Sequence, residues 1–262
     1  MAFPPERIVC LTEETVETLY LLGQSKRIVG VTGYAVRPPE VRREKPRVGA
    51  FTSADIPSIL ALKPDLVLTF SDLQADIAAE LIKNGIVVHA FNQRSVAGIL
   101  DMIRTLGALV GEASRAKELA LHYSERLDRV AERFANTPKP RVYFEEWDSP
   151  RIAGIRWVSD LIGIAGGTDV FRERAHAQDA TSRIVEDADI LSANPDVIVA
   201  SWCGKKVRAE RIASRDGWDQ IAAVQAGRIH EIKSPLILQP GPAALSDGLD
   251  ALCQALHGRV AA

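Results

Sequence analysis

The chain has 262 residues, of which 47% are hydrophobic and 25% are charged, and its formal net charge is −2. This is the composition of an ordinary globular protein, and the length suffices for one large domain or two small ones. The nearly neutral charge, with Lys and Arg spread along the chain, does not indicate nucleic acid or an anionic membrane as a partner. No apolar stretch reaches the length of a membrane span, so membrane insertion is not expected.

The N-terminus and the cysteines bear on the cellular compartment. Residues Met1 to Arg7 read MAFPPER and lack the basic start, apolar stretch and cleavage site of a secretory signal. This predicts a cytoplasmic location, with the periplasm as the alternative if the chain begins at a mature end. Cys10, Cys203 and Cys253 are odd in number and widely spaced, which does not indicate a disulfide framework and fits a reducing compartment.

A phrase near residue 60 recurs near residue 190. Residues 55–70 read DIPSILALKPDLVLTF, and residues 186–201 read EDADILSANPDVIVAS. In each, a short helix with an Ile-Leu pair ends at a Pro-Asp break, and a continuous apolar run follows that is typical of a buried parallel strand. Further β-runs follow at residues 85–89 and 227–232. The order helix, strand, helix, strand therefore occurs twice, which predicts two α/β lobes of similar architecture.

Between the two phrases lies an amphipathic stretch, Glu112 to Phe134. Apolar side chains recur there at steps of three and four residues, at Ala116, Leu119, Tyr123, Leu127, Val130 and Phe134. The pattern predicts one helix of about 35 Å. We expect an N-terminal lobe at residues 1–110, an inter-lobe helix at 111–136 and a C-terminal lobe at 137–262. A surface helix within one lobe is the alternative.

Ligands of parallel α/β sheets lie beyond the carboxyl ends of the strands, so the residues that follow each predicted strand are candidates. They include large aromatic side chains with hydroxyl and carboxyl groups nearby, which suit a broad, mostly apolar ligand with polar edges. For any single aromatic residue, packing within a lobe is the alternative. The candidate ligand-binding residues are Thr12, Glu13, Tyr34, Phe51, Phe70, Ser71, Glu146, Trp147, Trp157, Trp202, Cys203, Ser234 and Leu236.

The sequence lacks the motifs of the common enzyme classes. It has neither a G-x-x-x-x-G-K-[ST] phosphate loop nor a G-x-S-x-G elbow. Residues 163–167 are rich in glycine but follow a predicted helix, so they are interpreted as a helix C-cap. Glu145 and Glu146 are adjacent on a strand and cannot easily face one substrate together. We therefore predict non-catalytic binding, without catalytic residues or a cofactor.

Metal ligation is not predicted, because the histidines form no H-E-x-x-H pair and the cysteines form no C-x-x-C pair. His176, in a polar stretch, is kept as a candidate ligand of a metal or of cobalt. Cys203 follows a predicted strand and is expected to be a buried, unreactive thiol, with a ligating thiolate as the alternative.

These phrases resemble the class III substrate-binding proteins of the Fe³⁺-siderophore and cobalamin importers, and most of all the cobalamin-binding branch. In the first half the matching residues are 7–11 with Glu17, 30–34 and 62–67. In the second half they are 146–150, 202–204 and 241–242. The resemblance extends over about residues 6–258, and its most specific parts are Glu146-Trp147-Asp148-Ser149-Pro150 and Cys203-Gly204.

The resemblance implies two Rossmann-like lobes with parallel sheets, joined by one long α-helix, and a monomeric protein. It implies a corrinoid, cobalamin-like ligand in the inter-lobe cleft and an ABC permease as partner. The family's corrin-contacting aromatic residues correspond to Tyr34 and Phe70, and the segment 234–238 corresponds more loosely. One acidic permease-docking residue corresponds to Asp76, whereas the second falls near residues 238–239, which carry no charge.

Two alternatives to corrinoid binding stay open. A ferric siderophore or haem is the first, because Arg151, Arg156, Lys205 and Lys206 are expected near the loops of the cleft and could bind anionic groups. The second is an enzyme that processes a corrinoid, with Cys203, His176 and Glu146 as the reactive groups.

Overall fold

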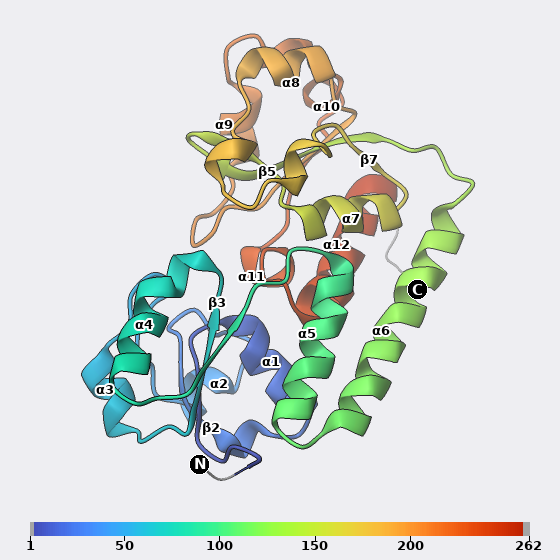
Figure 1. The fold of residues 1–262 in the computed structure, drawn as a ribbon. Helices are drawn as coiled ribbons and strands as arrows, with labels where there is room; N and C mark the ends of the chain where they lie inside the picture. Colours follow the sequence, from blue (N-terminus) through green and yellow to red (C-terminus); the bar gives the residue numbers. More distant parts are fainter. Residues whose placement is uncertain (1–2, 259–262) are drawn as a thin grey trace. The chain divides into compact units, whose positions relative to one another are not determined.

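The computed structural model describes residues 3–258 and shows an α/β protein whose chain divides into two compact units. Unit 1 contains the chain up to Gln93 together with Ala97–His122, and unit 2 contains Arg94–Val96 together with the chain from Tyr123 onward. The boundary falls inside α6 (Ala113–Phe134), one uninterrupted helix in Figure 1. The helix predicted over residues 112–134 is thus confirmed, as is the fold class of two Rossmann-like lobes joined by one long helix.

Unit 1 is built on a parallel sheet with the strand order β2-β1-β3-β4. Its central strands, β1 and β3, are buried along their whole length because helices cover the sheet. The strands are β1 (Ile8–Cys10), β2 (Ile28–Val31), β3 (Leu66–Phe70) and β4 (Val88–Phe91). The helices are α1 (Glu13–Leu21), α2 (Val41–Glu44), α3 (Ile56–Ala61), α4 (Ala75–Lys83) and α5 (Val96–Leu109), with 3₁₀ turns η1 (Ser25–Arg27) and η2 (Asp72–Gln74).

Unit 2 has the strand order β6-β5-β8-β9, with the short strand β7 also paired to β5. All pairs are parallel except β5 with β6, which form a hairpin through residues 149–150. The strands are β5 (Arg141–Asp148), β6 (Arg151–Ala153), β7 (Thr168–Asp169), β8 (Val197–Ala200) and β9 (Ile229–Glu231). The α-helices are α7 (Arg156–Ile164), α8 (Asp187–Ala193), α9 (Ala209–Ala213), α10 (Ala222–Gln225), α11 (Ser234–Ile237) and α12 (Leu249–His257). Short turns of helix are η3 (Arg174–His176), η4 (Thr181–Arg183), η5 (Trp218–Gln220) and the π-helical η6 (Ala244–Gly248).

The repeated phrase forms the same local structure in both units. Helices α3 and α8 are each followed, one residue before the proline, by a residue with positive φ: Lys63 (49°) and Asn194 (39°). Proline cannot continue a helix, so the chain leaves the helix at the same step in both places and enters β3 or β8.

The aspartate of each Pro-Asp pair forms hydrogen bonds with the backbone at the start of the neighbouring strand. The Asp65 carboxylate accepts hydrogen bonds from the backbone N–H groups of Glu6 (2.8 Å) and Arg7 (3.0 Å), just before β1. The Asp196 carboxylate accepts one from the N–H of Arg141 (2.7 Å), at the start of β5. The repeated sequence therefore reflects a repeated structural role: in both units, an aspartate side chain fixes the register of a central strand, β1 or β5.

Two further expectations can be compared with the fold. Gly166 has a φ of 76° and follows Ala165, the C-cap residue of α7, which confirms residues 163–167 as a helix C-cap. Within residues 3–258, none of the helices is both long and apolar enough to cross a membrane.

Candidate functional site

In unit 1 the candidate residues gather where β1 and β3 end. Thr12, which follows β1 by two residues, is extended and occupies the N-cap position of α1, without a capping hydrogen bond from its side chain. Its hydroxyl lies 3.1 Å from that of Thr15, and Thr15 donates to the backbone carbonyl of Thr12 (3.0 Å). Glu13 and Glu14 occupy the first turn, so the helix begins with two carboxyl groups at the carboxyl edge of the sheet.

These two carboxyl groups are buried, Glu13 being 8% and Glu14 2% exposed. Burial raises the pKa of Glu13 to about 7. Burial and the adjacent Glu13 charge raise the pKa of Glu14 to about 8, against a smaller opposing effect from a Thr12 hydrogen bond. A helix N-terminus favours an anion, but the loss of water outweighs that effect here.

The end of β3 is fixed by Gln74, which belongs to no motif recognised in the sequence. Its side-chain carbonyl accepts from the N–H of Phe70 (2.9 Å), and its amide donates to the carbonyls of Leu11 (3.1 Å) and Phe51 (2.7 Å). Gln74 is 1% exposed, so these bonds are shielded from water. It ties together three segments that carry candidate residues. A side-chain amide that bonds only to backbone groups leaves no sequence motif.

The aromatic candidates of unit 1 differ in exposure. The Tyr34 side chain is 45% exposed and follows β2, whereas Phe70 is 5% exposed and contributes to the core. Phe51 is half-buried, and Ser71 is buried with a φ of 60°. Tyr34 therefore presents the most accessible aromatic surface among these candidates.

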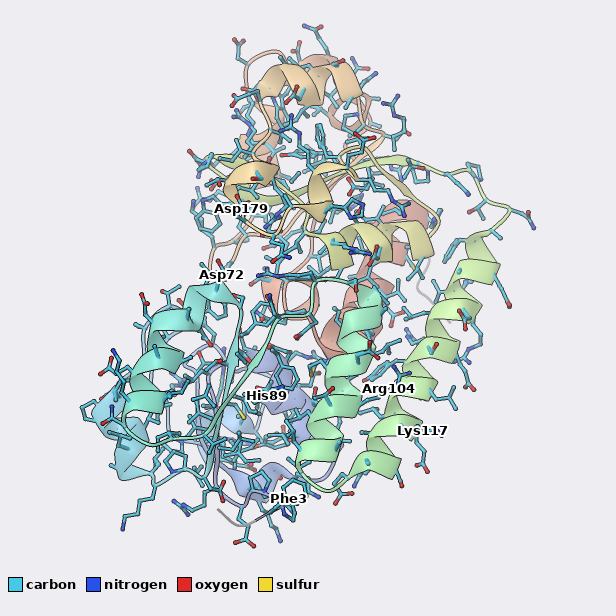
Figure 2. The ribbon with its side chains drawn as sticks, viewed as in Figure 1. Phe3, Asp72, His89, Arg104, Lys117 and Asp179 are labelled. Carbon is cyan, nitrogen blue, oxygen red and sulfur yellow. The ribbon has the colours of Figure 1, made fainter. Side chains whose placement is uncertain are left out.

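Other polar groups of the unit have packing roles or lie at the surface. His89, on β4, packs edge-on against Phe91 with ring centroids 4.3 Å apart, and Figure 2 labels it. Asp76 is exposed in the first turn of α4.

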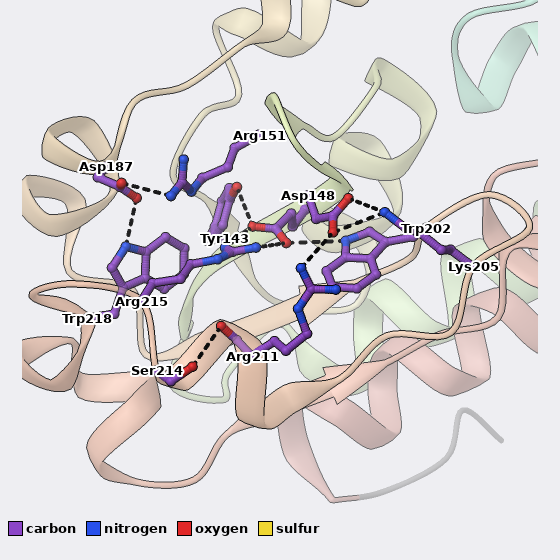
Figure 3. A network of polar contacts seen from close by, with 11 residues as sticks. Tyr143, Asp148, Arg151, Asp187, Trp202, Lys205, Arg211, Ser214, Arg215 and Trp218 are labelled. Atoms are coloured by element: carbon purple, nitrogen blue, oxygen red, sulfur yellow. Dashed lines mark hydrogen bonds and ion pairs between the residues drawn. The ribbon is translucent and has the colours of Figure 1, made fainter.

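In unit 2 a buried ion pair joins Arg215 to Glu145, a residue in the second half of β5. Glu145 is fully buried and accepts two bonds from the Arg215 guanidinium, at 2.5 and 2.9 Å. It also accepts from the indole N–H of Trp202 (3.2 Å) and the hydroxyl of Tyr143 (3.1 Å). Figure 3 shows this network with Arg215 between the Tyr143 and Trp218 side chains. The carboxylate is thus fully engaged in holding three segments together.

Glu146, the next residue, pairs with a different arginine. Arg183, 3% exposed at its side chain, binds it through both terminal nitrogens, at 2.6 and 3.0 Å. Glu146 also accepts from the N–H of Ile155 (3.1 Å). The two adjacent glutamates therefore serve separate partners, as the strand alternation predicts.

The end of β5 also carries a cluster of charge and aromatic rings, of which the Lys205 side chain is exposed. The Lys205 ammonium bonds both oxygens of Asp148, at 2.9 and 3.2 Å (Figure 3). It lies 4.8 Å from the ring centroid of Trp147 and 5.7 Å from that of Trp202. Cation–π attraction and the ion pair together hold the loop after β8 against β5. Trp147 is half-buried, so part of its ring stays accessible.

The remaining candidates of unit 2 are placed as follows. Trp157 and Trp202 are 4% and 2% exposed, and Trp157 donates to the carbonyl of Ile237 (2.9 Å), so both contribute to packing. Ser234 and Leu236 are half-buried in α11. Cys203 is exposed, so the expectation of a buried thiol is wrong: the loop that follows β8 turns outward after Trp202.

His176 is exposed in η3. Among residues 3–258, His, Cys, Asp and Glu side chains do not come together in threes in a way that could hold a metal ion. The carboxylates at the end of β5 are bound to Arg183, Lys205 and Arg215, and these ion pairs fix the carboxylate side chains in place. The arginine partners lie 70 and 37 residues away in sequence, which is why the sequence did not reveal them.

Comparison with known proteins places the chain in a family. The model of the periplasmic binding protein family matches residues 8–236, and the chain belongs to that family. It is 27% identical to an uncharacterized ABC transporter substrate-binding lipoprotein of Bacillus subtilis, over 97% of this chain and 80% of that protein. It is 24% identical to the vitamin B12-binding protein of Vibrio cholerae, over 96% of this chain and 89% of that protein.

A solved structure is similar as well. The apo periplasmic haem-binding protein of Roseiflexus sp. RS-1 superposes with a TM-score of 0.82, at 22% identity, over 96% of this chain and 99% of that one. This likeness supports the fold. The relatives are binding proteins, which agrees with the expectation of a class III substrate-binding protein.

The predicted cytoplasmic location is wrong. The family is that of periplasmic binding proteins, and the relatives are described as a lipoprotein and as periplasmic. The prediction used the N-terminal residues, of which Met1 and Ala2 lie outside the described part of the chain.

Proposed function

We propose that this protein is the extracytoplasmic substrate-binding protein of an ABC importer and that it binds a corrinoid without changing it chemically. The observation that carries the proposal is the match to a vitamin B12-binding protein over nearly the whole of both chains. The accessible rings of Tyr34 and Trp147, at strand ends of their units, support it. The corrinoid is the cargo, so no cofactor is required, and the protein acts as a monomer.

The candidate residues divide into two roles in this proposal. Tyr34, Phe51 and Trp147 supply aromatic contact to the corrin ring, and the polar candidates Thr12, Glu13 and Ser71 bind its edge. The others, Phe70, Glu146, Trp157, Trp202, Cys203, Ser234 and Leu236, frame or support the contacting residues. The burial of Phe70, Trp157 and Trp202 supports this second role.

Replacing Tyr34 or Trp147 by leucine is expected to weaken cyanocobalamin binding about tenfold or more for each, because each change removes an aromatic contact surface. Isothermal titration measures the two dissociation constants. Phe3→Leu is the control, since Phe3 is an exposed aromatic residue (74%) that follows no strand. Unchanged affinity in both variants would remove these residues from the site.

Haem is the second candidate ligand. Tyr34 favours it, because an exposed phenol is a known type of axial ligand to haem iron. If haem binds, Tyr34→Phe abolishes the shift of the Soret band that haemin shows with the wild-type protein. A ferric siderophore has less support, because Arg151 and Lys205 are already paired with Asp187 and Asp148.

Asp76 is proposed to contact the permease, since it is exposed at the start of α4. Asp76→Asn is expected to lower uptake of labelled cyanocobalamin severalfold in the organism that carries the gene, while its affinity for purified protein stays constant. Glu80→Gln, an exposed acidic position on the same helix, is the control. Equal uptake by wild type and Asp76→Asn would exclude Asp76 from docking.

A further inference from the structure

The two most specific phrases of the sequence come together at the end of β5. The first contributes Trp147 and Asp148, and the segment of the second contributes Lys205, which contacts both. Lys205 reaches them because the chain turns tightly after β8: its backbone N–H donates to the carbonyl of Trp202 (3.2 Å), and Gly204 has a φ of 68°. Glycine adopts this left-handed conformation without strain, so the glycine of the second phrase permits the turn that brings Lys205 to the indole ring.

Contacts of three kinds act on the Trp147 side chain. Its indole N–H donates to the carbonyl of Ser149 (3.0 Å), and the half-buried ring packs against the hydrophobic core of unit 2. The Lys205 ammonium lies 4.8 Å from the centroid of the ring. The hydrogen bond to Ser149 stays within the hairpin of β5 and β6, whereas the Lys205 contact links the ring to the loop after β8.

Lys205 is itself held in place by a carboxylate. Asp148, whose side chain is 6% exposed, accepts from the ammonium at 2.9 and 3.2 Å. Arg211 approaches the same carboxylate at 4.0 Å, as Figure 3 shows. A lysine side chain has many rotamers, and an ion pair with a nearly buried carboxylate restricts them. The ammonium is therefore fixed beside the Trp147 ring.

We propose that Lys205 is a positioning residue of the ligand site, which holds the Trp147 ring in the orientation that contacts the corrinoid. This inference rests on the proposed function and adds a residue to it. A side chain that is not fixed loses rotational freedom when a ligand binds, and this loss weakens binding. A ring that is fixed beforehand avoids the loss. Lys205 acts through Trp147, without touching the ligand.

The next residue offers a matched comparison for Lys205. Lys206 is also an exposed lysine, and its charge acts on Glu231. Across residues 3–258, its ammonium lies over no aromatic ring. A change from lysine to methionine at either position removes one positive charge from the same loop, but only the change at Lys205 removes a contact with Trp147.

Calorimetric titration with cyanocobalamin at pH 7 tests the proposal in a double-mutant cycle. Lys205→Met is expected to weaken binding about three- to tenfold, because the Trp147 ring must then be ordered by the ligand. In the Trp147→Leu background the same change should have no further effect, since the ring on which it acts is gone. Lys205→Arg should keep most of the affinity, because a guanidinium also lies over indole rings and pairs with carboxylates. Lys206→Met should bind as tightly as wild type.

Near-ultraviolet circular dichroism of the protein without ligand provides a second measurement, because aromatic side chains give a strong signal there only when tertiary packing fixes them. Lys205→Met is expected to reduce the part of the spectrum that Trp147→Leu removes. Lys206→Met should leave that part unchanged.

The results that would overturn the assignment differ from those that would overturn the proposed function. If Lys205→Met binds cyanocobalamin as tightly as wild type, weakens binding equally in both backgrounds, or leaves the spectrum unchanged, Lys205 does not act through Trp147, and the proposed function is unaffected. If wild-type protein binds no cyanocobalamin, the proposed function fails, and the role of Lys205 in binding fails with it.

Discussion

Replacing Arg215 by methionine is expected to destabilise unit 2 by about 3–5 kcal/mol, because it leaves the carboxylate of Glu145 buried without its cation. Glu145 is fully buried, and the Trp202 and Tyr143 donors that remain do not neutralise its charge. Methionine keeps an apolar side chain but removes the guanidinium, whose carbon lies 4.5 Å from the centroid of the Trp218 ring, so the change reports the loss of the ion pair together with this ring contact.

Chemical denaturation monitored by tryptophan fluorescence measures this effect selectively. All four tryptophans, at positions 147, 157, 202 and 218, belong to unit 2. Arg174→Met is the matched control: Arg174 pairs with Asp189, both side chains are 42% exposed, and the loss should stay below about 1 kcal/mol. If Arg215→Met lowers the free energy of unfolding no more than the control does, the buried pair does not support the end of β5.

Glu14→Gln is expected to make the protein more stable than wild type at pH 8, by about 2–4 kcal/mol, and to have little effect at pH 5. Burial raises the folded-state pKa of Glu14 from 4.5 to about 8, so the folded protein binds more protons than the unfolded chain between these values. Wild-type stability therefore falls as the pH rises through this window. Glutamine fills the same space and carries no charge to bury.

Thermal denaturation at pH 5, 6, 7 and 8 tests this expectation. The wild-type midpoint should decrease as the pH rises, and that of Glu14→Gln should decrease less, with the remaining slope reflecting Glu13. Glu80→Gln provides the comparison for an exposed carboxyl group. If the thermal midpoints of wild type and Glu14→Gln change with pH in parallel, Glu14 is ionised in the folded protein without a loss of stability.

The fold could be predicted from the sequence because its signals are local. The Pro-Asp phrases end the helices α3 and α8 through residues that are neighbours in the chain, and the apolar stripe of α6 repeats at helical spacing. The antiparallel hairpin of β5 and β6 was not anticipated, since residues 149–150 are too short a signal to show that the chain turns back on the same sheet edge.

The candidate site was predictable only in outline. The rule that ligands bind beyond strand ends selects Tyr34 and Trp147, which stay candidates, but it could not show that Trp202 is buried whereas the next residue, Cys203, is exposed. The partners that fix the site, such as Arg215 for Glu145, come from distant parts of the chain. The role of Gln74 could not be predicted for the same reason, because its three backbone partners become neighbours only when the sheet forms.

The central claim is corrinoid binding, and calorimetric titration of the wild-type protein with cyanocobalamin, haemin and a ferric siderophore, side by side at pH 7, tests it most directly. The account predicts saturable one-to-one binding of cyanocobalamin at micromolar or lower concentration and much weaker binding of haemin and of the siderophore. Tight binding of haemin or of the siderophore, with no heat from cyanocobalamin, would contradict it.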